Sequence, residues 1–366
     1  MRIGIDTQST LGQKTGIGQY TAHLLQALRS VTLEDEYIEL NRGADVLMRL
    51  DRRLRWQQFA LPLKAHRARV DLLHVTGFDA PLWHPCPTLL TVHDLIGILF
   101  PQNLPPISRF YWARWLPFSI RFATHLIADS DHTRRDLVRL LGVPELRITV
   151  VPLAAGVDCR PIQENDILQA LRQKYQLPLR FILFVSTIEP RKGLDTLMDA
   201  FARLLSVYGD IKLVIAGKKG WYTDRLYDQI ERLELKDHIT VTGHVPDEDL
   251  PALYNAAEVL AFPSRYKGFG LPVLEAMACG TPVVCSSSSS LPEVAGDAAL
   301  FVPPDDPQAL CSALHQLLEN EALRRQMREK GLAQAARFSW EETARKTSTV
   351  YRNVIRERGS DRARYR

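Results

Sequence analysis

The stretch Phe181-Ile182-Leu183-Phe184-Val185-Ser186 is a short, almost continuously apolar run. Apolar residues at helical spacing follow over residues 194–207, and a second apolar run comes next at 211–216. A run that is apolar throughout is typical of a parallel strand covered on both faces, and two such strands joined by a helix form a βαβ unit. This stretch therefore predicts an α/β fold built on a parallel sheet.

The same alternation of strand and helix extends in both directions from this unit. Further helical patterns lie at 21–30 and 248–257, and further apolar runs predict strands at 2–6, 71–75, 88–93, 125–129, 147–151, 238–242, 259–263, 282–285 and 299–302. The pattern pauses in a turn-rich stretch at 152–178. We therefore expect two Rossmann-like, doubly wound domains, residues 1–160 and 161–340, that face a central cleft. In such sheets ligands bind beyond the carboxyl ends of the strands.

Length and composition exclude several other classes of protein. The chain has 366 residues, which suits two domains. Its net charge of +4 is too small to indicate a nucleic-acid binder. Five cysteines without a C-x-x-C pair favour a reducing compartment over a disulfide framework or zinc site. Neither a signal peptide nor a spanning segment is visible, so we expect a cytoplasmic protein, or one on the cytosolic face of the inner membrane.

Two candidate sites lie in the first domain. The loop Thr15-Gly16-Ile17-Gly18-Gln19-Tyr20 precedes the first helix, and its glycines would let backbone amides approach an anion; a simple turn is the alternative. Thr91-Val92-His93-Asp94 ends a predicted strand. His93 would point into the cleft, and a hydrogen-bonded core histidine is the alternative.

A third candidate site follows the first strand of the second domain. The segment Ser186-Thr187-Ile188-Glu189-Pro190-Arg191-Lys192-Gly193 places two adjacent cations at the start of a helix. Cations are unfavourable there because the helix dipole is already positive, unless an anion binds. Arg191 and Lys192 could clamp a diphosphate, and a solvated basic helix start is the alternative.

The fourth site is the longest motif. It reads Pro263-Ser264-Arg265-Tyr266-Lys267-Gly268-Phe269-Gly270-Leu271-Pro272-Val273-Leu274-Glu275-Ala276-Met277-Ala278-Cys279-Gly280. Its glycine-rich half could offer consecutive backbone amides to phosphate or sugar oxygens. Glu275, one helical turn further on, could accept two hydrogen bonds from a ribose diol.

A serine-rich stretch follows the fourth site. Ser290-Leu291-Pro292-Glu293 has the spacing of a capping box, with proline in the first turn. We interpret this stretch as a loop that enters a helix, without a functional role.

These motifs, together with Leu291-Pro292-Glu293-Val294-Ala295-Gly296, resemble those of the retaining glycosyltransferases of family 4, which have the GT-B fold. The resemblance runs from Met1 to about Tyr351. It is nearest to the mannosyltransferase-like branch that builds bacterial surface polysaccharides. The resemblance implies an acceptor-binding domain at 1–160, completed by a C-terminal helix at about 341–358, and a nucleotide-sugar domain at 161–340.

The resemblance also implies a role for each matching residue. His93 would contact the donor sugar, Arg191 and Lys192 would bind the diphosphate, and Glu275 would hold the ribose hydroxyls. His244 would lie near the base. The remaining donor-binding positions are the glycines and their neighbours: Gly16, Gly18, Gly268, Phe269, Gly270 and Leu271.

The implied reaction moves a hexose to a growing glycan or a lipid-linked acceptor. Mannose from GDP-mannose is the favoured donor, and a UDP-sugar is the alternative. The nucleotide sugar is a substrate, so no cofactor is expected. The resemblance also implies that no metal is needed, because side chains and helix N-termini neutralise the diphosphate. Retention without a carboxylate nucleophile suggests front-face substitution.

The sequence departs from the family pattern at Lys267, where relatives carry a glutamate eight positions before Glu275. A carboxylate there would favour a transition state with positive charge at the reacting carbon, whereas an ammonium opposes it by several kcal/mol. The chain could therefore bind nucleotide sugars with little or no transfer. Alternatively, Lys267 could pair with a carboxylate on the donor sugar, or it could swing away from the site.

Basic and aromatic residues suggest a membrane contact in the first domain. Residues 42–69 carry eight basic side chains against two acidic ones: Arg42, Arg49, Arg52, Arg53, Arg55, Lys64, Arg67 and Arg69. The segment 109–118 mixes arginines with tryptophan, tyrosine and phenylalanine. This combination suits an anionic leaflet. A solvated basic face beside a core aromatic cluster is the alternative.

Overall fold

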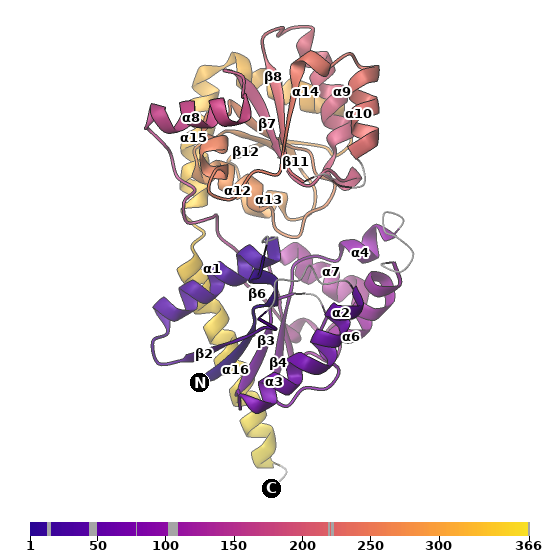
Figure 1. The fold of residues 1–366 in the computed structure, drawn as a ribbon, viewed down its shortest axis with the longest axis vertical. Coiled ribbons are helices and arrows are strands. Elements are labelled where there is room, and N and C mark those ends of the chain that lie inside the picture. Colours follow the sequence, from indigo (N-terminus) through magenta and orange to yellow (C-terminus); the bar gives the residue numbers. More distant parts are fainter. Residues whose placement is uncertain are drawn as a thin grey trace. The chain divides into compact units, whose positions relative to one another are not determined.

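The computed structural model describes residues 1–12, 16–43, 50–77, 79–101, 109–218, 220 and 223–364, so Thr15 and Arg49 lie outside it. The chain forms two compact units. Unit 1 comprises Met1–Leu153 and Ser339–Arg366, and unit 2 comprises Ala154–Phe338. Each unit has a six-stranded parallel sheet with helices packed on it, which confirms the α/β prediction (Figure 1).

The sheet of unit 1 has the strand order β2-β1-β3-β4-β5-β6. Its strands are β1 (Arg2–Asp6), β2 (Glu36–Leu40), β3 (Leu72–Val75), β4 (Thr88–Val92), β5 (His125–Ala128) and β6 (Ile148–Val150). The chain leaves β1 toward one side for β2 and toward the other side for β3. The carboxyl ends of β1 and β3 therefore form the topological switch point of this sheet.

Strand β2 was not predicted from the sequence. In Glu36-Tyr37-Ile38-Glu39-Leu40 two glutamates interrupt the apolar side chains, and β2 lies at the sheet edge, where it pairs with β1. An edge strand that is half exposed lacks the continuous apolar run of the central strands. The sequence pattern that predicts the central strands is therefore absent from β2.

Helices cover both faces of the unit 1 sheet, and the C-terminal helix joins them. The helices are α1 (Gly16–Val31), α2 (Leu50–Arg55), α3 (Leu61–Arg67), α4 (Ile96–Leu99), α6 (Leu116–Ile120), α7 (Asp131–Leu141) and α16 (Trp340–Arg364), with short helical turns at Gln8–Thr10, Trp56–Ala60, Tyr111–Trp115 and Glu145–Arg147. Helix α16, yellow in Figure 1, packs along α1.

The sheet of unit 2 has the order β12-β11-β10-β7-β8-β9. Its strands are β7 (Phe181–Val185), β8 (Lys212–Ala216), β9 (Ile239–Gly243), β10 (Val259–Phe262), β11 (Val283–Ser286) and β12 (Ala299–Val302). The side chains of β7 and β10 are almost fully buried, as their apolar sequences predict. The switch point of this sheet lies between these two strands.

The helices of unit 2 bury an apolar core against this sheet. They are α8 (Asn165–Tyr175), α9 (Leu194–Leu205), α10 (Thr223–Arg232), α11 (Leu250–Ala256), α12 (Leu271–Ala278), α13 (Leu291–Ala295), α14 (Pro307–Glu319) and α15 (Glu321–Ala335), with turns at Pro190–Lys192 and Lys236–His238. In the described residues of either unit, we find no helix with the length and hydropathy needed to cross a membrane.

Candidate nucleotide-sugar site

The third and fourth sequence motifs meet at the switch point of unit 2. Strands β7 and β10 are hydrogen-bonded neighbours, so the loops after them leave the same edge of the sheet. One loop carries Arg191 and Lys192, and the other carries Lys267 and the glycines before α12. Open α/β sheets bind ligands at this position.

Close backbone packing fixes the two loops together. The N–H of Arg265 donates to the carbonyl of Arg191 at 2.8 Å. Gly193 has a φ of +70°, and a Cβ there would lie 2.1 Å from the carbonyl oxygen of Pro263. Only glycine permits both this conformation and this approach. The loops therefore form one rigid structure.

Arg191 offers a donor to a ligand. It lies in the 3₁₀ turn Pro190–Lys192, and its Nε is 2.8 Å from Oε2 of Glu189. Its Nη1 is buried and makes no hydrogen bond within the described residues. Leaving a buried charged donor unpaired is costly, and an anion would remove that cost. Lys192, next to it, is only 3% exposed.

Arg265 is a structural cation that the sequence analysis did not single out. Its Nη2 donates to Asp195 at 2.7 Å, its Nε donates to Asp305 at 2.6 Å, and its Nη1 donates to the carbonyl of Pro190. Two carboxylates thus compensate its charge. Arg265 therefore holds the β10 loop against the turn Pro190–Lys192 and α9.

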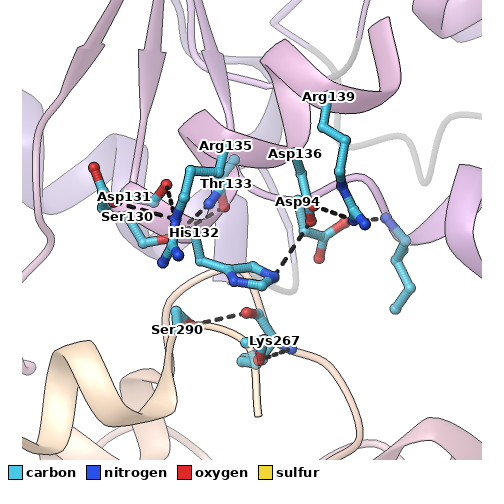
Figure 2. Close-up of polar contacts among 12 residues, drawn as sticks. Asp94, Ser130, Asp131, His132, Thr133, Arg135, Asp136, Arg139, Lys267 and Ser290 are labelled. Carbon is cyan, nitrogen blue, oxygen red and sulfur yellow. Dashed lines mark hydrogen bonds and ion pairs between the residues drawn. The ribbon is translucent and has the colours of Figure 1, made fainter.

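The serine stretch supports the loop that contains Lys267. Ser289 Oγ accepts from the N–H of Lys267 at 2.9 Å. Ser290 Oγ donates to the carbonyls of Lys267 (2.8 Å; Figure 2) and Phe269 (2.5 Å). The prediction that a loop enters a helix here is confirmed, since Ser290 immediately precedes α13. The predicted cap is wrong, because the Ser290 hydroxyl makes no capping bond and donates to this loop instead.

The residues from Gly268 to Leu271 present mainly their backbone. The ring of Phe269 is buried and packs edge-to-face on Phe338, with 5.9 Å between ring centroids. Gly270 adopts a φ of +123° just before α12, and Leu271 begins that helix. Phe269 can therefore offer its amide to a ligand while its ring anchors the loop.

Glu275 lies half-buried on α12. Its Oε2 accepts a hydrogen bond of 2.9 Å from the buried Tyr254 hydroxyl. Burial raises the pKa of Glu275, and the Tyr254 hydrogen bond and the positive charge of Lys267 partly offset this rise. The ammonium of Lys267 is thus close enough to act on the Glu275 carboxylate. His244 is exposed directly after β9, which lies two strands beyond β7.

In unit 1, two oxygen atoms favour the charged form of His93. Its Nδ1 lies 2.6 Å from Oδ2 of Asp129, and its Nε2 lies 2.9 Å from the carbonyl oxygen of Thr76. An imidazolium can donate to both, because each of its ring nitrogens carries a proton. Burial favours the neutral ring, but the Asp129 carboxylate outweighs it, and the pKa of His93 is raised.

Asp129 is a site residue that the sequence analysis missed. It follows β5, which pairs with β4, so both side chains leave the same edge of the sheet. Ser130 caps α7 by accepting from the N–H of Thr133 at 3.0 Å, and Thr133 donates to the His93 carbonyl at 3.4 Å (Figure 2 labels the cap). The sequence did hold a signal for Asp129, since it is a carboxylate at the end of a predicted strand, as His93 is at the end of another.

The glycines predicted to approach an anion lie in the first turn of α1. Gly16 begins this helix, and a Cβ on it would meet no atom within 4 Å. Gly18 is buried. Across the described ranges of both units, His, Cys, Asp and Glu side chains form no group of three that could hold a metal ion.

Two family models match the chain. The model described as "Glycosyl transferases group 1" matches residues 169–334, and "Glycosyltransferase Family 4" matches residues 19–159. The O-antigen chain mannosyltransferase B of Escherichia coli is 39% identical over 264 residues, which cover 72% of this chain and 69% of that protein. The chain therefore belongs to glycosyltransferase family 4.

Further relatives agree with this assignment. The serotype-specific mannosyltransferase WbdA of Escherichia coli is 33% identical over 267 residues, 71% of this chain but 32% of WbdA. Among solved structures, sucrose-phosphate synthase from Thermosynechococcus elongatus has a TM-score of 0.78 at 21% identity and covers 97% of this chain and 99% of its own. Anabaena HepE with UDP-glucose has a TM-score of 0.74 at 19% identity, over 96% and 100% of the two chains. These structures confirm the GT-B fold, and the chain is a glycosyltransferase.

Proposed function

We propose that the protein transfers a hexose, with mannose from GDP-mannose as the favoured donor, to a glycan or a lipid-linked acceptor. The 39% identity to a relative named as an O-antigen chain mannosyltransferase supports this sugar and this acceptor class. In the proposal unit 2 binds the nucleotide sugar and unit 1 binds the acceptor. A UDP-sugar is the alternative donor.

The buried, unpaired Nη1 of Arg191 is the observation that carries the proposal. A diphosphate would accept from it, and Lys192 would add a second charge. The backbone amides from Gly268 to Leu271 would bind phosphate and sugar oxygens. In the same proposal Glu275 would bind the ribose, and His244 would lie near the base. In unit 1, His93 would contact the sugar, and Gly16 and Gly18 would contribute to donor binding.

The proposed chemistry retains the configuration of the sugar. The bond between the anomeric carbon and the β-phosphate oxygen breaks, and the acceptor hydroxyl bonds to the same face of that carbon. The leaving phosphate takes the acceptor proton. Arg191 and Lys192 would stabilise the charge that develops on the diphosphate, so the proposal needs no metal.

Lys267 supports a second candidate function, a nucleotide-sugar-binding protein with little or no transfer. Its ammonium stands where relatives carry a carboxylate, and its charge reaches Glu275. The variant Lys267→Glu separates the two functions. If Lys267 limits activity, this variant raises transfer by about a hundredfold or more, as several kcal/mol of charge reversal imply. Unchanged transfer with every sugar donor tested would exclude Lys267 as the limiting residue.

A thermal-shift screen of the intact protein against GDP-, UDP- and ADP-sugars tests the donor assignment. A bound ligand raises the apparent Tm by mass action. We expect GDP-mannose to give the largest shift in the wild type and a much smaller one in Lys192→Ala. A shift of equal size in both proteins would remove Lys192 from the site.

We also propose that unit 1 contacts an anionic membrane on the cytosolic side through its basic and aromatic helices. Arg52, Arg55, Lys64 and Arg67 are exposed on α2 and α3. Flotation with vesicles of phosphatidylglycerol and phosphatidylcholine tests this contact. We expect binding at low salt that weakens as salt rises. Absence of binding at low salt would contradict it.

A further inference from the structure

Unit 1 contains an apolar pocket of about 560 Å³, a volume in the usual range of ligand sites. Seven of the residues that line it are apolar: Leu50, Leu54, Phe59, Leu82, Trp83, Phe110 and Trp115. Three of their rings are largely exposed, namely Phe59 (72%), Phe110 (67%) and Trp83 (54%). A concave pocket of this volume with a mainly apolar lining is typical of a ligand-binding site.

Two π-helical turns, Trp56–Ala60 and Tyr111–Trp115, build the walls of the pocket. The N–H that closes each turn donates to the carbonyl five residues earlier, and the pairs Leu61-Pro62 and Leu116-Pro117 follow the two turns. Proline has no N–H with which to continue the four-residue pattern. π-Helical turns are rare in proteins, and many of those known lie at functional sites. Here two such turns line the same pocket.

The floor of the pocket is rigid because a buried carboxylate holds its polar side chains. Asp79 accepts hydrogen bonds from the Tyr111 hydroxyl at 2.6 Å, Trp115 Nε1 at 3.0 Å and Gln58 Nε2 at 2.7 Å. These hydrogen bonds fix the positions of Gln58, Tyr111 and Trp115, all three of which line the pocket. The pocket is therefore formed before any ligand binds.

The residues that follow β3 connect the pocket floor to His93. Thr76, three residues before Asp79, accepts from His93 Nε2 with its carbonyl. The Thr76 hydroxyl donates to the carbonyl of Asp6 at 2.9 Å. This segment follows β3, at the switch point of the unit 1 sheet. Residues just after β3 thus contact both the pocket-lining side chains and His93.

The charge around the pocket is strongly positive. Residues 50–67 hold five lysines and arginines with one acidic residue, and residues 109–122 hold three arginines with none. Arg55 is exposed and lines the pocket itself. An apolar hollow with a cationic border complements a molecule that has a hydrocarbon chain and an anionic head group.

We propose that this pocket holds the hydrocarbon chain of the lipid-linked acceptor, one acyl or isoprenoid chain attached to a phosphate that Arg55 and its basic neighbours bind. The inference rests on the proposed transfer to a lipid-linked acceptor and names the part of that acceptor that unit 1 recognises. It goes beyond adsorption to a membrane surface because it requires a single chain to enter a preformed pocket.

Calorimetry with water-soluble alkyl phosphates, each below its critical micelle concentration, tests the proposal without a membrane. We expect decyl phosphate to bind the wild type about tenfold more tightly than octyl phosphate, because each buried methylene adds affinity. Butyl phosphate tests the head group alone and should bind too weakly to detect. Equal affinity for all three chain lengths would overturn the proposal.

Two variants that fill the pocket test its location. Leu54→Trp and Leu82→Trp should each lower the affinity for decyl phosphate by at least tenfold, and thermal unfolding shows which of the two is folded. Leu63→Trp is the matched control, since Leu63 is exposed on α3 and does not line the pocket. It should bind decyl phosphate as the wild type does. Wild-type affinity in a folded Leu54→Trp or Leu82→Trp would place the chain elsewhere and overturn the proposal.

The donor screen on the same preparation separates this inference from the proposed function. Donor binding without chain-dependent binding of decyl phosphate would overturn the pocket inference and leave the transferase proposal standing. Chain-dependent binding without binding of any nucleotide sugar would support the pocket and contradict the transferase proposal.

Discussion

The surroundings of His93 favour its charged form, because both of its ring nitrogens face oxygen acceptors. Its native pKa is raised above the ordinary value of 6.5. The folded state thus holds the proton more tightly than the unfolded chain. The pair with Asp129 therefore stabilises the fold fully below pH 6.5, and this stability is lost as the pH rises through the native pKa.

The variant Asp129→Asn should lower the pKa of His93 by at least about one unit, since it removes a neighbouring negative charge. An NMR titration of the histidine ring measures this directly. Asp131→Asn is the control, because Asp131 is a nearby carboxylate that pairs with Arg134 and Arg135 instead. If His93 titrates identically in the Asp129→Asn variant and the wild type, its charge has another cause.

Arg191, Lys192 and Glu275 lie in motifs that the sequence alone identifies as candidate donor-binding segments. The structure brings the two segments together, because they follow the neighbouring strands β7 and β10. Asp129 and Arg265 were missed because their importance depends on which strands and loops become neighbours. Local spacing does not contain that information.

At the scale of elements, the sequence predicts the central strands well, but it does not predict which loops hydrogen-bond to each other. The apolar runs predict β7 and β10 because burial on both faces leaves a clear signal. The edge strand β2 leaves no such signal. Ser290 was interpreted as a cap because its spacing fits one, whereas its hydroxyl binds the loop that contains Lys267.

The contact between the β7 and β10 loops depends on Gly193. We expect Gly193→Ala to lower the free energy of unfolding by about 2–4 kcal/mol, because left-handed strain and a clash with the Pro263 carbonyl add together. Gly43→Ala is the control. Gly43 has the same φ of +70°, but a Cβ there would meet no atom within 4 Å, so only the strain of about 1 kcal/mol applies. Urea unfolding measures the free energy of unfolding of both variants. An equal loss in Gly193→Ala and Gly43→Ala would contradict the clash with the Pro263 carbonyl.

At the scale of the whole chain, its last helix belongs to the unit that contains its first residues. Tyr351 on α16 bonds His74 Nδ1 at 2.8 Å, and His74 Nε2 bonds the Thr91 hydroxyl at 2.8 Å. His74 is fully buried on β3, and burial lowers its pKa to about 3. The folded state therefore requires the neutral ring.

The buried, neutral ring of His74 predicts how the free energy of unfolding depends on pH. The unfolded chain binds a proton at His74 below pH 6.5 and the folded protein does not, so stability falls by up to about 1.4 kcal/mol per pH unit between 6.5 and 3. His74→Gln should have a shallower slope over this range. His66→Gln, at an exposed position on α3, should follow the wild type. Urea unfolding at several pH values decides, and identical slopes for His74→Gln and the wild type would contradict the account.

The central claim is that unit 2 binds a nucleoside diphosphate at the edge where β7 and β10 end. The most direct test is a crystal structure of the protein with GDP. We predict phosphate oxygens within hydrogen-bond distance of Arg191 Nη1 and of the backbone amides between Gly268 and Leu271, with the ribose on Glu275. Ordered GDP at any other place on unit 2, with Arg191 Nη1 still unpaired, would contradict it.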